Sequence, residues 1–314
     1  MTRIVCIGEC MVELRAVGQD TFARSYAGDV YNTAVYLKRS LPGAQVQFLT
    51  ATGDDAMSGA MRRRWKEQGI DDALAFSVEG GSAGLYLIET DAFGERSFHY
   101  WRRHSAAKRW LALLEARGDS ALRGADVVYF SGISLAILDP DERAAAIDLL
   151  RRLRTHVGRI AFDPNVRPRL WQSTHVAVQC MRAALSVCDI ALPSAEDLAA
   201  LFQVDEPMRQ VELLMEMGVP EAAVTVAADG CVIAEGDLRA QLPGLRVEQV
   251  VDTSGAGDAF NGVYLANRLQ GSSPEVAAKA ALLVASRVVT HAGAIVPAPV
   301  SHPDVAAGAS CDQS

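Results

Sequence analysis

Short apolar runs alternate with longer amphipathic stretches along nearly the whole chain. The short runs have the length and composition of buried strands and lie at 3–8, 46–50, 127–131, 160–163, 190–192, 223–226 and 231–234. The longer stretches have helical spacing and lie at 32–39, 57–68, 141–155, 175–186, 211–217, 258–269 and 274–291. Strands separated by helices in this way predict an α/β fold, with a mostly parallel sheet between two layers of helices.

The region from 74 to 104 interrupts this alternation. Three strand-like runs, at 74–78, 84–90 and 96–102, follow one another and are joined by turns at 80–81 and 91–94. They predict an antiparallel meander, which is too small to be stable alone and to which 11–15 adds a further strand. We expect this small sheet to project from a single domain spanning 1–314. Ligands of α/β proteins bind at the carboxyl ends of the parallel strands, so the sheet is placed to act as a lid.

Composition and charge narrow the class of protein. Half of the residues are hydrophobic and 22% are charged, which excludes a disordered chain. The net charge of −8 argues against a nucleic-acid or anionic-membrane binder, because both need clustered Lys and Arg. No run approaches the ~18 apolar residues of a membrane span, and the apolar run at 4–8 is too short for a signal peptide. Scattered cysteines without a CxxC pair fit a reducing compartment, so we expect a cytoplasmic protein.

The densest chemical signal is the segment 251–260, in which small residues run directly into an amphipathic helix. Gly255, Ala256 and Gly257 carry no bulky side chain, so their backbone N–H groups can converge at the positive end of that helix. This geometry predicts an anion hole suited to phosphate. Asp258 follows in the first turn, where it could deprotonate a bound hydroxyl or simply cap the helix. A carboxylate beside an anion hole repels the anion, which favours the catalytic role over capping.

The segment resembles the signature of the PfkB (ribokinase-like) carbohydrate kinases, which carry Asp-Thr-x-Gly-Ala-Gly-Asp at this point. Further matches are Ile7-Gly8-Glu9, Gly28-Asp29-x-Tyr31-Asn32, and Thr52-Gly53-Asp54-Asp55 with Gly59. The resemblance covers most of the chain and implies a three-layer ribokinase-like fold, ATP and Mg²⁺ as cofactors, and Asp258 as the catalytic base. It also implies a set of substrate-binding residues, namely Gly28, Asp29, Tyr31, Asn32, Asp252 and Asp258. From spacing alone, Asp29 and Asn32 could equally cap the helix that follows them.

On the nucleotide side, the resemblance implies phosphate contacts from the anion hole and from the loop 225–230. The residues implied are Ser194, Thr225, Ala227, Asp229, Gly230, Gly255 and Gly257. Two positions depart from the family pattern, since Ala227-Ala228 stand where many relatives have Lys-x-Gly, and Ser194-Ala195-Glu196-Asp197 where Asn-x-x-Glu is frequent. Ser194 and Asp197 remain polar, so we expect a contact to Mg²⁺ through water and no direct protein ligand. The chain contains no Walker-type loop.

The segments 8–14, 28–34 and 162–171 resemble the 2-keto-3-deoxygluconate kinases of this family. Strand alternation places Phe98, Tyr100 and Arg102 on one face, next to Tyr86 of the neighbouring strand. Aromatic rings with an arginine over a sugar site suit a substrate that bears a carboxylate. Arg167, just after the strand 160–163, would supply a second guanidinium. The alternative is that Arg102 and its neighbour are ordinary solvated charges.

Together these patterns predict ATP-dependent phosphoryl transfer to the 6-hydroxyl of 2-keto-3-deoxygluconate, a small sugar acid. Two alternatives remain at this point. One is a kinase of the same family that acts on ribose, fructose or adenosine, and the other is a non-catalytic, sugar-binding regulator. Lids of this kind often pair between subunits in the family, which implies a homo-oligomer.

Overall fold

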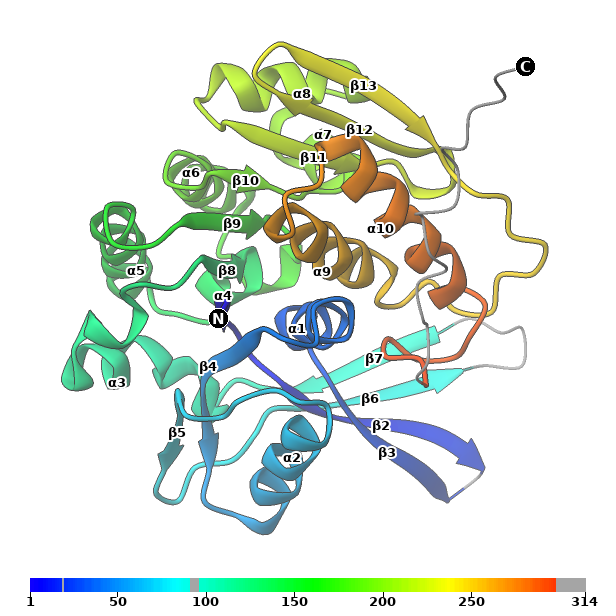
Figure 1. The fold of residues 1–314 in the computed structure, drawn as a ribbon. Helices are drawn as coiled ribbons and strands as arrows, with labels where there is room; N and C mark the ends of the chain where they lie inside the picture. Colours follow the sequence, from blue (N-terminus) through cyan, green and yellow to red (C-terminus); the bar gives the residue numbers. More distant parts are fainter. Residues whose placement is uncertain (19, 91–95, 298–314) are drawn as a thin grey trace.

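A large sheet forms the middle layer of the computed structural model, which describes residues 1–18, 20–90 and 96–297 (Figure 1). Its strand order is β13-β12-β11-β10-β9-β8-β1-β4-β5. The strands are β1 (Arg3–Ile7), β4 (Gln45–Gly53), β5 (Ala75–Val78), β8 (Val127–Ser131), β9 (Arg159–Asp163), β10 (Ile190–Ala191), β11 (Glu221–Thr225), β12 (Gly230–Glu235) and β13 (Leu238–Pro243). All pairs from β5 to β11 are parallel, and β12 and β13 add an antiparallel edge.

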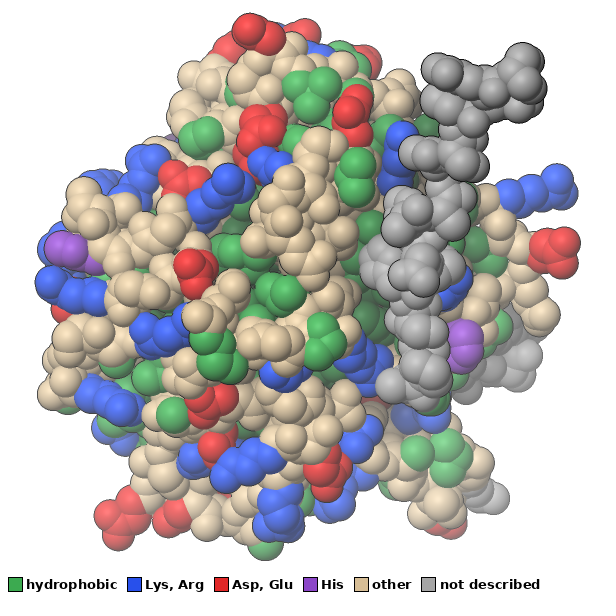
Figure 2. Space-filling model, in the orientation of Figure 1, with side chains coloured by type: hydrophobic (Ala, Val, Ile, Leu, Met, Phe, Trp, Pro, Cys, Tyr) green, Lys and Arg blue, Asp and Glu red, His purple; other side chains and the backbone are tan. Residues whose placement is uncertain are grey.

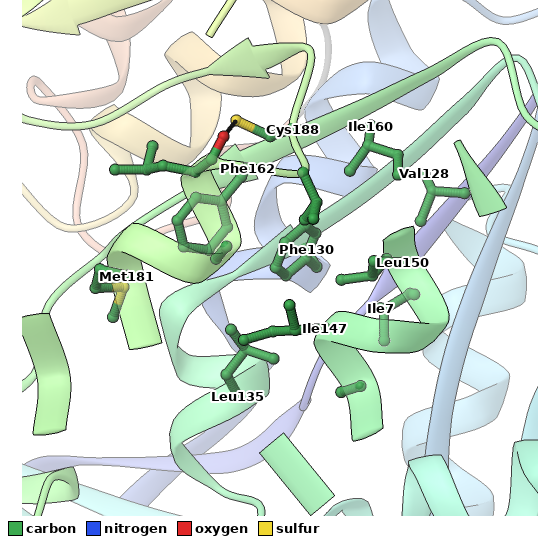
Figure 3. Packing of buried hydrophobic residues seen from close by; sticks show 14 of the residues in the cluster. Ile7, Val128, Phe130, Leu135, Ile147, Leu150, Ile160, Phe162, Met181 and Cys188 are labelled. Carbon is green, nitrogen blue, oxygen red and sulfur yellow. Dashed lines mark hydrogen bonds between the residues drawn. The ribbon is translucent and has the colours of Figure 1, made fainter. Parts of the chain in front are cut away.

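Helices cover both faces of this sheet, and each face has its own apolar core. One core is shared by α1 (Asp29–Ser40), α2 (Ala56–Glu67), α9 (Ala256–Leu269) and α10 (Pro274–Val288). The other is shared by α3 (Trp110–Arg117), α4 (Gly132–Ala136), α5 (Pro140–Leu153), α6 (Thr174–Leu185), α7 (Ala195–Phe202) and α8 (Pro207–Glu216). In this second core the ring centroids of Phe130 and Phe162 are 4.6 Å apart, with Ile147 and Met181 beside them (Figure 3). Burial on both faces explains why the strands read as continuous apolar runs.

The small sheet contains four strands in the order β3-β2-β6-β7 and extends away from the main body (Figure 1). They are β2 (Met11–Gly18), β3 (Thr21–Ala27), β6 (Leu85–Thr90) and β7 (Arg96–Trp101). The predicted three-layer architecture and separate small sheet are confirmed. The assignment of 74–78 to the small sheet is wrong, because β5 pairs in parallel with β4 at the edge of the large sheet. Strands β6 and β7 pair antiparallel, as predicted, and β2 joins the sheet in parallel with β6. The predicted turn at 91–94 lies outside the described residues.

Helices α1 and α9 pack unusually closely, and this crossing positions the chemistry described below. An ideal Cβ on Gly262 would lie 2.5 Å from the Thr33 carbonyl oxygen and 2.8 Å from the Leu37 nitrogen. Only glycine fits at this point, because any side chain would push the two helices apart. The N-terminal turns of α1 and α9 consequently meet at one end of the sheet.

The described surface agrees with the charge pattern of the sequence. Figure 2 shows acidic and basic side chains interspersed over one face of the molecule. Within the described residues, no helix combines the length and the apolar content that a membrane crossing requires.

Candidate active site

Two aspartates from the first turns of α1 and α9 face the carboxyl ends of the parallel strands. Asn32 Nδ2 donates a hydrogen bond of 2.8 Å to Asp258 Oδ2, and Asn165 Nδ2 donates one of 2.8 Å to Asp29 Oδ2. Each aspartate keeps its other oxygen out of these bonds. The pair can therefore accept further hydrogen bonds from the hydroxyl groups of a sugar.

The carboxyl group of Asp258 has a pKa of about 7, raised from an ordinary value of 3.8. Burial is the main cause, and the nearby charge of Asp29 raises this pKa further. The hydrogen bond from Asn32 and the positive charge of Arg167 act in the opposite direction. A general base works best when its pKa lies near the working pH, so Asp258 is suited to proton abstraction near neutrality.

A third carboxylate, Asp163, ends strand β9 behind this pair and is only 7% exposed. It accepts hydrogen bonds from the Asn165 backbone at 2.9 Å and from Asn261 Nδ2 at 2.8 Å. Burial and the charges of neighbouring aspartates raise its pKa well above the usual value. Sequence reasoning gave these residues no role. The signal for Asp163 was its place at the carboxyl end of a buried strand, whereas nothing local marked Asn261.

The start of α9 has the geometry of an anion site. Gly255 caps the helix with φ of +76°, a left-handed conformation that favours glycine. The Ala256 amide closes a turn with the Thr253 carbonyl at 3.3 Å, whereas those of Gly255 and Gly257 have no hydrogen-bond acceptor within the described part of the chain. An ideal Cβ on Gly257 meets no atom within 4 Å, so there is open space in front of this turn. Unpaired amides at the positive end of a helix favour a phosphate group.

Asp252 holds the loop that leads into this turn. Its Oδ1 accepts from the Ser254 amide at 2.9 Å and its Oδ2 from the Gly293 amide at 2.7 Å, and the residue is 6% exposed. A cavity of about 410 Å³ lies beside the same loop, between segment 246–251 and the end of α10. Val251 of this loop lines the cavity together with Arg287 and Thr290.

The residues predicted for the nucleotide side lie on neighbouring loops. Ser194 forms a bridge with Thr225, and the Ser194 hydroxyl donates to Asp197 Oδ2 at 2.9 Å. The Val166 amide donates to Asp197 Oδ1 at 2.9 Å, so both oxygens of this carboxylate are occupied. In the adjacent turn, Ala227 has φ of +42°, and Asp229 precedes the buried Gly230. This left-handed conformation is strained for a residue other than glycine.

The predicted aromatic face of the small sheet is present. Tyr86, Phe98 and Tyr100 form a cluster of rings. The centroids are 5.7 Å apart for Tyr86 and Tyr100, 6.4 Å for Tyr100 and Phe98, and 6.5 Å for Tyr86 and Phe98. Arg102, which we predicted to be available to a substrate carboxylate, already forms an ion pair with the buried Glu9. Arg167 is exposed, and its charge lowers the pKa of Asp258, so it lies near the aspartates.

Tyr31 corrects a second expectation. We predicted that it contacts substrate, but it is 1% exposed and lies in the core. Its ring centroid is 6.0 Å from that of Phe48 and 6.1 Å from that of Trp65. Two other residues predicted from the same motif do lie at the site, namely Gly28 at the N-cap of α1 and Asp29. Tyr31 points away from them because α1 is buried on almost every side.

Comparisons with known proteins agree with this geometry. Residues 1–301 match the model of the pfkB family of carbohydrate kinases. The chain is 41% identical over 303 residues to a 2-dehydro-3-deoxygluconokinase of Dickeya dadantii, covering 94% of this chain and 96% of that protein. It is 40% identical over 304 residues to the protein of the same name from Escherichia coli K12, with coverage of 94% and 97%.

Solved structures show the same fold at lower identity. Fructokinase of Vibrio cholerae with fructose, ADP and calcium superposes with a TM-score of 0.81 at 23% identity, covering 94% of this chain and 95% of that one. A putative ribokinase II of Escherichia coli in complex with ATP and Mg²⁺ gives a TM-score of 0.79 at 20% identity, with coverage of 94% and 95%. Because the family model matches residues 1–301, the chain belongs to the pfkB family of carbohydrate kinases.

Proposed function

We propose that the protein phosphorylates the 6-hydroxyl of 2-keto-3-deoxygluconate with ATP, giving the 6-phosphate. The relatives that bear this activity in their names align over 94% of the chain at 36–41% identity. The observation that carries the chemistry is the near-neutral pKa of Asp258 beside the unpaired amides of α9. Arg167, and the part of the Arg102 guanidinium that Glu9 leaves open, would supply the hydrogen-bond donors and positive charge that an acid substrate needs.

In this mechanism Asp258 accepts the proton of the 6-hydroxyl. At the same time the hydroxyl oxygen forms a bond to the γ-phosphorus of ATP, and the bond between the γ-phosphorus and the oxygen bridging to the β-phosphate breaks. Asn32 holds the carboxylate in place through its 2.8 Å hydrogen bond. The amides of Gly255 and Gly257, with that of Ala256, stabilise the charge on the phosphoryl oxygens. Such positioning and electrostatic stabilisation supply most of the catalysis in phosphoryl transfer.

The donor chemistry of the site is compatible with Mg²⁺ that is held by phosphate oxygens and water. Among the described residues, no group of three or more acidic, His or Cys side chains is arranged to hold a metal ion directly. Asp197 and Ser194 would orient water molecules around such an ion, because both carboxylate oxygens of Asp197 already accept hydrogen bonds. When bound, the ion neutralises charge on the transferred phosphoryl group.

For the base of the nucleotide, we assign the cavity of about 410 Å³ beside the Asp252 loop. The phosphate groups would then lie next to the turn between β11 and β12, which contains Thr225, Ala227, Asp229 and Gly230.

The protein would act as a homo-oligomer in the cytoplasm. Its small sheet exposes large apolar side chains outside that aromatic cluster, Phe22 and Trp101, that a second copy would cover. Its described cysteines are free thiols, as a reducing compartment requires. Sedimentation of the wild type, compared with a Phe22→Ser and Trp101→Ser double variant, would test this pairing.

One assay tests the activity itself. ADP release is measured with 2-keto-3-deoxygluconate, ribose, fructose and adenosine as acceptors, and kcat/KM is compared among them. The proposal requires the keto acid to have the highest value. A higher value for a neutral acceptor would instead indicate another sugar or nucleoside kinase, and no ADP release with any acceptor would indicate a binding protein.

A further inference from the structure

A buried ion pair joins the segment that first enters the small sheet to the segment that finally leaves it. Glu9 lies between β1 and β2, and Arg102 directly follows β7. Arg102 Nη2 donates to Glu9 Oε2, and the two side chains are 12% and 1% exposed. Removing one member of a pair buried this deeply leaves the other charge uncompensated.

Both members of the pair keep a polar atom without a partner. Arg102 Nε and Glu9 Oε1 are buried and form no hydrogen bond within the described residues. An unsatisfied buried donor is unfavourable, and Nε itself is enclosed and not open to a ligand. The side chain of Arg102 is still 12% exposed, so the open part of its guanidinium can donate to a carboxylate.

Close contacts tie Glu9 to its neighbours on two sides. An ideal Cβ on Gly84 would lie 2.8 Å from Glu9 Oε1 and 3.3 Å from Arg102 Cβ, so this glycine leaves the space that the pair occupies. Gly28, the N-cap of α1, approaches the Glu9 main-chain carbonyl closely. Glu9 therefore contacts both the arginine of the small sheet and the turn that carries Asp29.

We infer that Glu9 is a positioning residue for recognition of the substrate acid, because it orients the Arg102 guanidinium before the substrate binds. The inference rests on the proposed function, in which Arg102 pairs with the carboxylate of the keto acid. An arginine side chain has several rotatable bonds. Fixing it in the free enzyme removes part of the ordering cost of binding, and this gain appears in the affinity for the acid.

The test is Glu9→Gln, which keeps the size of the side chain and one acceptor oxygen but removes the charge. KM for 2-keto-3-deoxygluconate should rise about tenfold, as expected for the weakening of one charge-assisted contact. The kcat and the KM for ATP should stay within about twofold, since neither depends on the orientation of Arg102. The neutral amide of the same acid should show an unchanged KM, because it forms no ion pair.

Glu221→Gln is the matched control. Glu221 is 2% exposed and bonded to Arg268, but it starts β11 at the opposite end of the parallel strands. This variant should lower the melting temperature without changing the KM for the acid. In an Arg102→Ala background, Glu9→Gln should have no further effect on that KM, because the two residues act through one interaction.

The outcomes separate the two claims. If the wild type phosphorylates the keto acid and Glu9→Gln leaves its KM unchanged, or raises the KM for acid and amide equally, the inference alone is overturned. If the wild type does not phosphorylate the keto acid, the proposed function is overturned, and the role of Glu9 with it.

Discussion

Asn32 and Asp258 are 226 residues apart in the chain, yet a 2.8 Å hydrogen bond joins their side chains. The bond links the first turns of α1 and α9 at the point where both helices face the carboxyl ends of the strands. It fixes one oxygen of the carboxylate and lowers the pKa of Asp258 against the opposing effects of burial and Asp29. The same contact thus affects both the orientation and the basicity of Asp258, the base of the proposed mechanism.

Replacing Asp258 with Asn removes the base and keeps the shape of the side chain. Turnover should fall by at least the ~10²–10⁴-fold that general-base catalysis contributes. ATP should still bind, because the backbone amides of α9 are unchanged. Steady-state kinetics and ATP titration by calorimetry measure the two effects, and near-normal turnover would rule out the role of Asp258 as the base.

The raised pKa of Asp258 also makes stability depend on pH. Between its unfolded value of 3.8 and its folded value of about 7, the folded protein holds a proton that the unfolded chain has lost. Stability from this group is therefore lost as the pH rises through that window. The Asp258→Asn variant lacks this dependence. The melting temperature of the variant minus that of the wild type should therefore become more positive between about pH 5 and about pH 8. A constant difference over this range would contradict the shifted pKa.

Asn32→Ala should shift the acidic limb of the activity profile to higher pH. The variant loses the donor that lowers the pKa of Asp258, so the base becomes protonated at higher pH than in the wild type. The profile of kcat against pH measures this, and kcat separates the shift from any lost substrate contact, which raises KM. An unmoved limb would show that the hydrogen bond does not tune the base.

Two glycine variants separate an effect on protein stability from an effect on the approach of phosphate to the α9 amides. Gly255→Ala introduces a Cβ 2.5 Å from the Ala294 carbonyl oxygen at a φ of +76°, so it should lower the melting temperature together with the activity. Gly257→Ala meets no protein atom within 4 Å and should leave stability intact while activity falls, since its methyl group occupies space in front of the amides. Full activity of Gly257→Ala would show that phosphate does not approach there.

Arg167→Ala should raise the KM for the keto acid with little change in the affinity for ATP. The charge of Arg167 lowers the pKa of Asp258, so the guanidinium lies close enough to pair with a bound acid. An exposed charge pair contributes up to about 1 kcal/mol, which corresponds to a several-fold change in KM. Arg169→Ala, an exposed arginine on the same segment, is the control and should leave both values unchanged. An equal loss of affinity for acid and nucleotide would argue against a role in acid recognition.

The features that sequence predicted well depend on consecutive residues. Gly255, Gly257 and Asp258 follow one another, so the turn, the unpaired amides and the carboxylate could be inferred together. The stacked face of Tyr86 and Tyr100 followed from the two-residue period of a strand. These predictions needed no knowledge of how distant elements pack.

The features that sequence missed depend on neighbours that only the topology brings together. Strand β5 pairs with β4 and not with the strands that follow it, and Asn261 reaches Asp163 only because α9 covers β9. Tyr31 was misplaced because every residue from Val30 to Leu37 in α1 is buried, so the helix has no distinct polar face to indicate direction. The pairing of Arg102 with Glu9 likewise required the fold.

Gly262 has no functional group, yet its bare Cα allows α1 and α9 to touch, and the first turn of each helix carries one half of the Asn32–Asp258 contact. A single added methyl group there would push the two helices apart and separate these side chains. In the proposed mechanism, the distance from the proton acceptor to the alcohol is therefore set partly by the absence of atoms.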